Sequence, residues 1–170
     1  MFELTAPFGI SLEASAPLSF DDLVARHQAM VFRTAWRMLG SPADAEDVAQ
    51  LVLLKLHEYR GEPSAAWIYR VTVNLCRDQI RKRRPQAEEG VLELQVAGTQ
   101  TPEEQFEQAE RRFRLALWIA RLPERERACL VLRDLEGLNS REVAAILECS
   151  EETVRSAIHR AKEKLKQWMS

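Results

Sequence analysis

Basic and polar side chains recur every three or four residues along one stretch of the chain, "WIYRVTVNLCRDQIRKRR" (67–84). The recurring residues are Arg70, Asn74, Arg77, Arg81 and Arg84. In a helix this spacing stacks them on one face, with Trp67 at its border. Arginines neutralise phosphates, an asparagine hydrogen-bonds a base edge, and a tryptophan stacks on an unpaired base. The stretch therefore predicts a contact with DNA that is partly single-stranded.

The same stretch also has a purely structural interpretation. The basic cluster at 81–84 is what the negative end of a helix dipole favours, and Trp67 would serve equally well as a core residue. Solvated helix faces usually mix charges of both signs. The unmixed stripe therefore favours the nucleic-acid interpretation, whereas for Trp67 alone both interpretations stay open.

The C-terminal stretch "NSREVAAILECSEETVRSAIHRAKEKLKQWM" (139–169) has the spacing of a short helix, a three-residue turn and a longer helix. On the first helix Val143, Ala144 and Leu147 would face inward, and Ser150 would cap the second. This is the pattern of a helix-turn-helix, whose second helix enters the major groove. The residues we expect to meet base edges and phosphates are Glu151, Arg155, Ser156, His159 and Lys162. A helical hairpin with an ordinary solvated face is the alternative.

A third stretch, "PADAEDVAQLVLLKLHEY" (42–59), combines acids with leucines. Its inward face is expected to comprise Ala45, Val48, Ala49, Val52 and Leu56. The first turn and the opposite face carry Asp44, Asp47, Gln50, Leu51 and Leu54. Acids repel DNA, and an apolar centre with a charged rim is typical of a protein-contact surface. We therefore predict a protein partner here; the alternative is that both leucines pack beneath a neighbouring segment.

Helix-start and helix-stop residues divide the first half of the chain into three segments, with no strand pattern. Ser19 is placed to cap a first helix that Gly40 ends, and Pro42 stands at the first position of the second. A short loop at 59–64 leads to the third helix, which Pro85 stops. One compact bundle is the expected result.

The second half is also expected to be helical, with segments at about 102–121, 123–137, 139–147 and 150–169. Between the halves, residues 86–101 lack a helical stripe and carry glycines and scattered acids, as linkers do. The sequence therefore predicts an all-α fold. Its parts are a tail (1–18) and two small helical domains (19–85 and 102–170) joined by a flexible linker (86–101), the second domain containing the helix-turn-helix.

Charge is divided unevenly along the chain. The net charge is only -2, yet residues 85–110 hold seven glutamates and no Lys or Arg, whereas 111–170 hold 13 basic against nine acidic residues. The overall charge is thus a poor guide to partners.

Neither an enzyme, a metal site nor a cofactor is suggested. Cys76, Cys129 and Cys149 are widely spaced, with no C-x-x-C motif and no nearby histidine pair, which is typical of buried thiols in a reducing cytosol. No nucleophile motif or phosphate loop accompanies the histidines. The N-terminal stretch lacks a basic region, and no apolar run approaches the roughly 18 residues of a membrane span. We expect a cytoplasmic protein without membrane insertion.

With these motifs in order, the chain resembles the extracytoplasmic-function (ECF, group 4) sigma factors, the small two-domain initiation factors of bacterial RNA polymerase. The motifs are "DAEDVAQ" (44–50), "WIYRVTVNLCRDQIRKRR" (67–84), "LPERERACLVLRDLEGLNSREVAAIL" (122–147) and "TVRSAIHRAKEKL" (153–165). The resemblance covers nearly the whole chain outside the tail and the linker. It implies sigma region 2 at 19–85 and sigma region 4 at 102–170.

The resemblance also implies a role for each surface. Asp44, Asp47 and Gln50 fall at the family's core-binding positions, which dock on the clamp helices of the largest catalytic subunit of core RNA polymerase. Trp67 and the basic helix correspond to the part that melts and reads the minus-ten promoter element, where Asn74 matches the family's asparagine. The helix-turn-helix corresponds to the reader of the minus-thirty-five element. Many relatives are held inactive by an anti-sigma factor, which is therefore a candidate partner.

Three positions depart from the family's pattern. Leu51 stands where a glutamate is frequent, Glu152 where a glycine is frequent, and Ala157 where an arginine is common. The last two alter the end of the recognition helix that enters the groove, so no minus-thirty-five sequence is carried over. The competing hypothesis is a helix-turn-helix regulator that binds duplex DNA without joining polymerase, and it assigns no role to the acidic helix.

Overall fold

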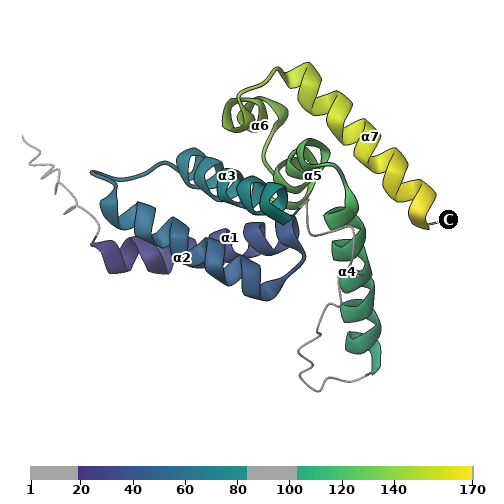
Figure 1. Cartoon of the computed structure of the whole chain (residues 1–170), viewed down its shortest axis with the longest axis horizontal. Helices are drawn as coiled ribbons and strands as arrows, with labels where there is room; N and C mark the ends of the chain where they lie inside the picture. The colour runs from purple at the N-terminus through teal and green to yellow at the C-terminus, as the bar shows by residue number, and fades with distance from the viewer. Residues whose placement is uncertain (1–18, 84–102, 170) are drawn as a thin grey trace, which may run out of the picture.

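The computed structural model describes residues 19–83 and 103–169, with side chains described over 19–83 and 110–169. Within these ranges every regular element is helical (Figure 1). The elements are α1 (Phe20–Leu39), α2 (Pro42–Glu58), α3 (Ala65–Arg83), α4 (Glu103–Arg121), α5 (Glu124–Leu130), η2 (Val131–Leu135), α6 (Ser140–Leu147) and α7 (Glu151–Met169). The predicted all-α fold is confirmed. The predicted tail and linker, with Arg84, lie outside the described residues.

The ends of α1 are set by the residues that the sequence predicts. The Ser19 hydroxyl accepts a hydrogen bond from the Asp22 backbone N–H at 3.2 Å, and the Asp22 carboxylate accepts one from the Ser19 N–H at 3.1 Å. This reciprocal pair is a capping box. Gly40 ends the helix in the left-handed conformation, with φ 69°. A β-carbon there would be strained and would lie 3.1 Å from Cβ of Ala120 in α4.

The first three helices form one bundle around a shared apolar core (Figure 1). On α2 the buried residues are Ala45, Val48, Val52 and Leu56, as predicted, with Ala49 half-buried. On α3 they are Ile68, Tyr69, Thr72, Val73 and Cys76. Because these faces turn inward, the acidic face of α2 and the basic stripe of α3 lie on the outside of the bundle.

The segment after α5 departs from the predicted single helix over 123–137. The α-helix ends at Leu130, and the chain continues as the π-helical turn η2, where the Glu136 N–H donates to the Val131 carbonyl at 2.9 Å. A π turn holds more residues than an α turn and so redirects the side chains that follow. Here the Glu136 carboxylate reaches Arg33 and Arg37 of α1. Nothing in the local sequence pattern distinguishes this turn from α-helix.

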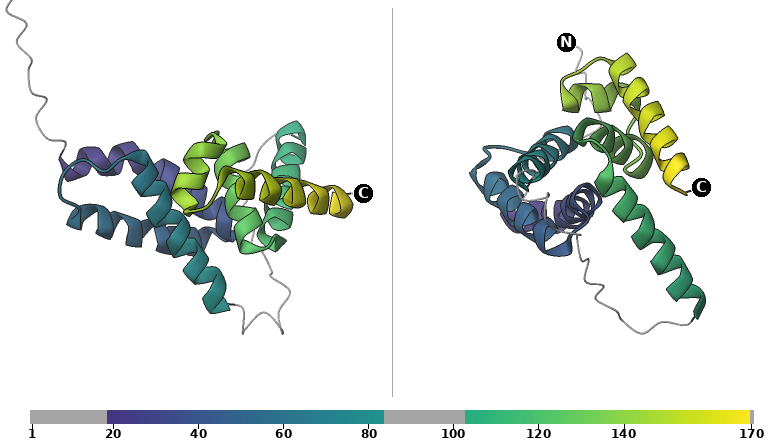
Figure 2. Two further views of the ribbon diagram at one scale, coloured as in Figure 1. Left: turned by 90° about the horizontal axis from the view of Figure 1, so that it is seen from above. Right: turned by 45° about the vertical axis from the view of Figure 1, so that its right-hand side comes forward.

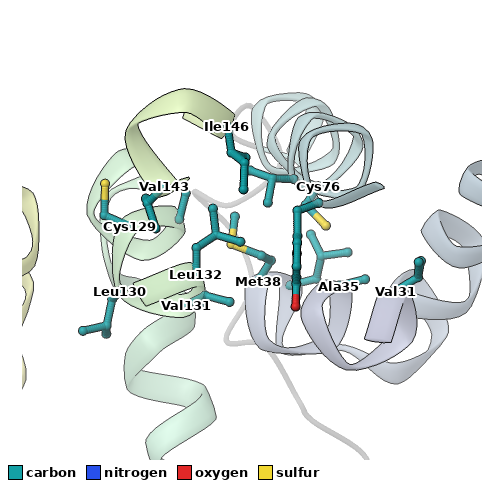
Figure 3. Close-up of a cluster of buried hydrophobic side chains, with 14 of the residues drawn as sticks. Val31, Ala35, Met38, Cys76, Cys129, Leu130, Val131, Leu132, Val143 and Ile146 are labelled. Atoms are coloured by element: carbon teal, nitrogen blue, oxygen red, sulfur yellow. The ribbon is translucent and has the colours of Figure 1, made fainter. Parts of the chain in front are cut away.

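The two halves of the molecule pack directly against each other (Figure 2). Leu132 of η2 and Ile146 of α6 join Met38 of α1 and Cys76 of α3 in one apolar cluster, each at most 3% exposed (Figure 3). Ile146 is not among the inward residues that the spacing predicts. It is buried because α6 meets α3 as well as α7, and the periodicity of one helix does not reveal a second partner.

Candidate nucleic-acid interface and adjoining surfaces

Two arginines of the α3 stripe share one acid from the second half of the molecule. Arg81 donates to both carboxylate oxygens of Glu124 at 3.0 and 3.2 Å, and Arg77 pairs with the same carboxylate. Burial raises the pKa of Glu124, but the hydrogen bonds and charges of the two arginines outweigh it, so the pKa lies below its usual value. Glu124 is therefore ionised at neutral pH, and its charge offsets part of the stripe.

Arg70, which lies nearer the start of α3 than Arg77 and Arg81, also contacts the second half of the molecule. It donates to the backbone carbonyl of Ala145 at 2.7 Å and lies 3.5 Å from the Glu148 carboxylate. Three predicted DNA-binding arginines thus lie along one contact between the halves.

Asn74 lies between Arg70 and Arg77 along the same face of α3, and it lines a pocket of about 460 Å³ between α2 and α3. Trp67 lines the same pocket and packs on Tyr59, with ring centroids 4.5 Å apart and planes tilted by 51°. Trp67 is half-buried against the core, so it contributes to packing, and its contact with DNA stays a prediction. An exposed amide beside two aromatic rings suits an unpaired base, which needs a stacking platform and a hydrogen-bond partner.

Tyr59 is a pocket residue that the sequence pattern alone does not mark. It follows α2 directly and meets Trp67 only because α2 and α3 pack side by side. The sequence signal was limited to two aromatic residues flanking a short loop.

The outer face of α2 exposes the two leucines predicted for a protein contact. Leu51 is 44% exposed and Leu54 61% exposed, and Asp47 and Gln50 beside them are exposed as well. No described segment covers either leucine. This contradicts the alternative that both pack beneath a neighbouring segment. Asp44 differs from the rest of this face, because it is half-buried and forms an ion pair with Arg83 at the end of α3.

A groove of about 490 Å³ extends this surface onto α1. It runs between the helices and is lined by Phe32 of α1 together with Ala49, Gln50 and Leu53 of α2. Phe32 is 36% exposed. The sequence pattern does not mark Phe32, because its spacing places it on the flank of an amphipathic helix, where only the partner helix decides exposure.

The C-terminal helix-turn-helix is confirmed, with clear caps on both helices. Asn139 and Glu142 form a capping box at the start of α6, with hydrogen bonds of 2.7 and 2.9 Å. Glu148 turns the chain with φ 53°, in the left-handed region. The Ser150 hydroxyl then accepts a hydrogen bond from the Thr153 N–H at 3.1 Å, which opens α7.

The predicted reading face of α7 is open to solvent. Four of its residues, Glu151, Arg155, Ser156 and His159, are exposed. Lys162 is exposed too but forms an ion pair with Asp134 at 2.7 Å. The opposite side of α7 is held to α5 through Glu126, a carboxylate 8% exposed that pairs with Arg160 and Lys164 at 3.3 and 2.8 Å. One side of α7 thus holds the helix to α5, and the residues of the predicted reading face are on the other, solvent-exposed side.

Within 19–83 and 103–169, no group of three or more His, Cys, Asp or Glu residues is arranged to hold a metal ion. In the same ranges no helix is both long enough and apolar enough to cross a membrane.

Comparison with known families matches both halves of the chain. Residues 23–86 match Sigma-70 region 2, and residues 112–165 match Sigma-70, region 4. The chain is 32% identical to the ECF RNA polymerase sigma-E factor of Escherichia coli (strain K12), over 85% of this chain and 83% of that protein. The chain belongs to the ECF sigma factors. It is therefore an alternative sigma factor of transcription initiation, which works with core RNA polymerase and promoter DNA.

Other relatives extend the match. The ECF RNA polymerase sigma factor SigE of Mycolicibacterium smegmatis is 32% identical, over 98% of this chain and 67% of that protein. Among solved structures, CnrH in complex with the cytosolic domain of CnrY is 29% identical, with a TM-score of 0.60 over 88% of this chain and 86% of that chain. The sigma factor RpoE of Bartonella quintana, solved with the anti-sigma factor NepR, shares the fold at 22% identity and a TM-score of 0.64, over 88% of this chain and 96% of that chain. Membership of this family rules out a regulator that acts without polymerase.

Proposed function

We propose that this ECF sigma factor divides initiation among three surfaces on two domains, region 2 at 19–85 and region 4 at 102–170. The outer face of α2 docks on the clamp helices of the largest polymerase subunit. The stripe and pocket of α3 hold the opened minus-ten element. The exposed face of α7 reads the minus-thirty-five element.

The observation that carries the proposal is the pocket in which Trp67 and Asn74 lie together. Asn74 lies between Arg70 and Arg77 in the helical spacing of α3, so a base held in the pocket would leave its neighbouring phosphates near these two arginines. Duplex DNA keeps its bases stacked and out of reach of such a pocket. Capture of an extruded base therefore favours the melted state, which is how a non-enzymatic protein promotes DNA opening.

The polymerase-binding role of α2 is supported by its exposed apolar centre. Leu51 and Leu54 are exposed among Asp44, Asp47 and Gln50, and burying such leucines against a partner supplies affinity while the rim charges fix its orientation. A negatively charged rim attracts a basic protein surface and repels DNA phosphates. The acids therefore favour binding of polymerase, and not of DNA, to this face.

Region 4 is suited to a second, weaker reading step. Arg155 is exposed in the first part of α7, where an arginine can make a bidentate contact with guanine, and the exposed Glu151 can accept a hydrogen bond from cytosine. Two weak readers on one chain bind a promoter well only when polymerase holds both in register.

Run-off transcription tests the proposal. Purified core polymerase, with and without this protein, would be incubated with promoter fragments from the host. We expect specific start sites only with the protein, and their loss with Asp47→Arg. Identical transcripts with core alone and with core plus protein would refute the assigned role.

An anti-sigma factor is a further proposed partner, acting in the cytoplasm on the groove between α1 and α2. Support comes from the apolar lining of that groove, which includes the exposed Phe32 and the half-buried Leu53, and from the solved relative that carries NepR. The test is a pull-down from the native host with two baits, the wild-type protein and the Phe32→Asp variant. We expect the wild-type bait to retain the partner and the variant to lose it. Absence of any stable complex would count against it.

A further inference from the structure

A pocket of about 360 Å³ lies where the ends of α1, α3 and α4 meet the start of α5. Its apolar lining comprises Leu39, Ile80, Ala120, Leu122 and Pro123. Pockets that hold small organic molecules usually enclose roughly 300–1,000 Å³ and combine an apolar lining with a few polar groups. None of these five apolar residues belongs to the surfaces proposed for polymerase or promoter DNA. The pocket therefore has room for a ligand that the proposed function does not use.

The polar lining of the same pocket is strongly basic. It consists of four arginines, Arg81, Arg83, Arg121 and Arg127, and one acid, Glu124. Arg81 is paired with Glu124, and Arg83 is paired with Asp44 of α2. Neither Arg121 nor Arg127 forms an ion pair with any acid in the described part of the chain. Two cations without an acidic partner thus line one largely apolar cavity.

Arg127 is a buried cation whose hydrogen-bond partners are all neutral. It is 7% exposed, and its guanidinium donates to the backbone carbonyls of Met38 at 2.7 Å, of Leu122 at 2.9 Å and of Ala120. These carbonyls lie at the ends of α1 and α4, whose partial negative charges offset part of the guanidinium charge. The Arg127 Nε–H is buried and has no hydrogen-bond partner in the described protein. Burial lowers the pKa of Arg127 to about 10, so the group is still charged at neutral pH, and a neighbouring anion would stabilise it.

Arg121 is the exposed cation of the pocket. Its guanidinium carbon lies 5.3 Å from the centre of the Trp168 ring. This cation–π contact holds the side chain in place but does not neutralise its charge. A guanidinium presents its N–H groups as a planar fork that matches a carboxylate or a phosphate. Arg121 is therefore available to bind the charged head of a ligand.

We propose that this pocket binds a small amphipathic anion, in which an apolar or aromatic body carries one carboxylate or phosphate. The body packs against the apolar lining, which includes Leu39 and Ile80. The head accepts hydrogen bonds from Arg121, and the buried charge of Arg127 adds to its stabilisation. A metabolite of this class is then an input to the sigma factor that differs from any partner protein.

The test is isothermal titration calorimetry on the full chain with two anions and their uncharged counterparts. AMP carries a phosphate and octanoate a carboxylate, and the counterparts are adenosine and octanamide. We expect one molecule of AMP or octanoate per chain, with the uncharged counterpart binding at least ~10-fold more weakly. Binding of AMP alone would identify a phosphate head, and binding of octanoate alone would identify a carboxylate head.

Two charge reversals locate the site. Arg121→Glu places a repelling charge at the pocket, and Arg125→Glu makes the same change at an exposed position of α5 that does not line it. We expect Arg121→Glu to weaken binding at least ~10-fold and Arg125→Glu to leave it unchanged. Thermal unfolding without ligand checks that both variants fold. Arg121→Gln, which removes the charge but introduces no acid, replaces Arg121→Glu if the latter unfolds.

Three results would overturn the proposal. The first is that neither anion binds. The second is an equal loss of binding with Arg121→Glu and Arg125→Glu, which would place the anion elsewhere. The third is inorganic phosphate binding as tightly as AMP, because the apolar lining would then contribute nothing.

Discussion

The Trp67 ring packs on the Tyr59 ring at 4.5 Å between centroids, directly beside the exposed amide of Asn74. The pair closes one side of a pocket that neither α2 nor α3 could form alone. Its location at the edge of the arginine stripe links base capture to phosphate binding, and this link predicts how individual substitutions should separate DNA melting from DNA affinity.

Trp67→Ala should reduce promoter opening by roughly 1–3 kcal/mol, the usual contribution of one stacked base. Run-off transcription on a duplex promoter should fall, whereas a promoter with a pre-melted minus-ten region should recover much of the activity. Trp67→Phe keeps an aromatic platform and serves as the control. Equal losses on duplex and pre-melted templates would show that Trp67 acts only through folding.

Leu54→Ala should weaken binding to core polymerase by roughly 1–2 kcal/mol, because an exposed leucine at the centre of a docking surface is a typical anchor. Folding stability should hardly change, since Leu54 is 61% exposed. Met169→Ala removes a side chain that is 60% exposed at the far end of α7 and is the matched control. The measurement is competition with a labelled sigma factor for core; no difference between the two variants would place the polymerase surface elsewhere.

The sequence predicted the parts of the fold that depend on local chemistry. The caps at Ser19 and Gly40, the inward face of α2 and the helix-turn-helix all follow from residue type and helical periodicity, and the structure confirms them. The exposure of Leu51 and Leu54 could be predicted for the same reason, since they lie opposite the apolar face.

What the sequence did not reveal depends on contacts between the halves. Glu136 resembles any surface acid at the end of a helix until η2 turns it towards α1. Ile146 is buried by α3, a helix some 70 residues away in the chain. The stripe of α3 was predicted as one DNA-binding face, but the structure assigns Asn74 to the pocket and pairs Arg77 with Glu124. No helical period encodes such partners.

The ion pairs of Glu136 with Arg33 and Arg37 predict a defined pH dependence of stability. Burial raises the pKa of Glu136, but its hydrogen bonds with Arg33 and the charges of both arginines outweigh it, so the folded-state pKa lies below the usual 4.5. A depressed pKa contributes stability that is present above pH 4.5 and is lost as the pH falls through the folded-state value. Glu136→Gln should therefore cost roughly 1–3 kcal/mol at pH 7 and much less at the lowest pH at which the protein stays folded. Urea unfolding at both pH values measures this; a cost that does not depend on pH would mean that packing, not charge, accounts for the contribution.

Arg155→Ala should relax the choice of minus-thirty-five sequence by roughly 1–3 kcal/mol, the discrimination that one bidentate contact provides. Arg155 is exposed near the start of α7, and its side chain forms no hydrogen bond or ion pair with any other described residue. Arg133→Ala removes an equally charged, exposed residue of η2 and should leave the preference intact. Transcription from a library randomised at the minus-thirty-five element, with holoenzyme carrying each variant, gives the measurement. If Arg155→Ala lowers transcription from all library sequences equally, Arg155 binds a phosphate, and Ser156 or His159 on the same face reads the bases.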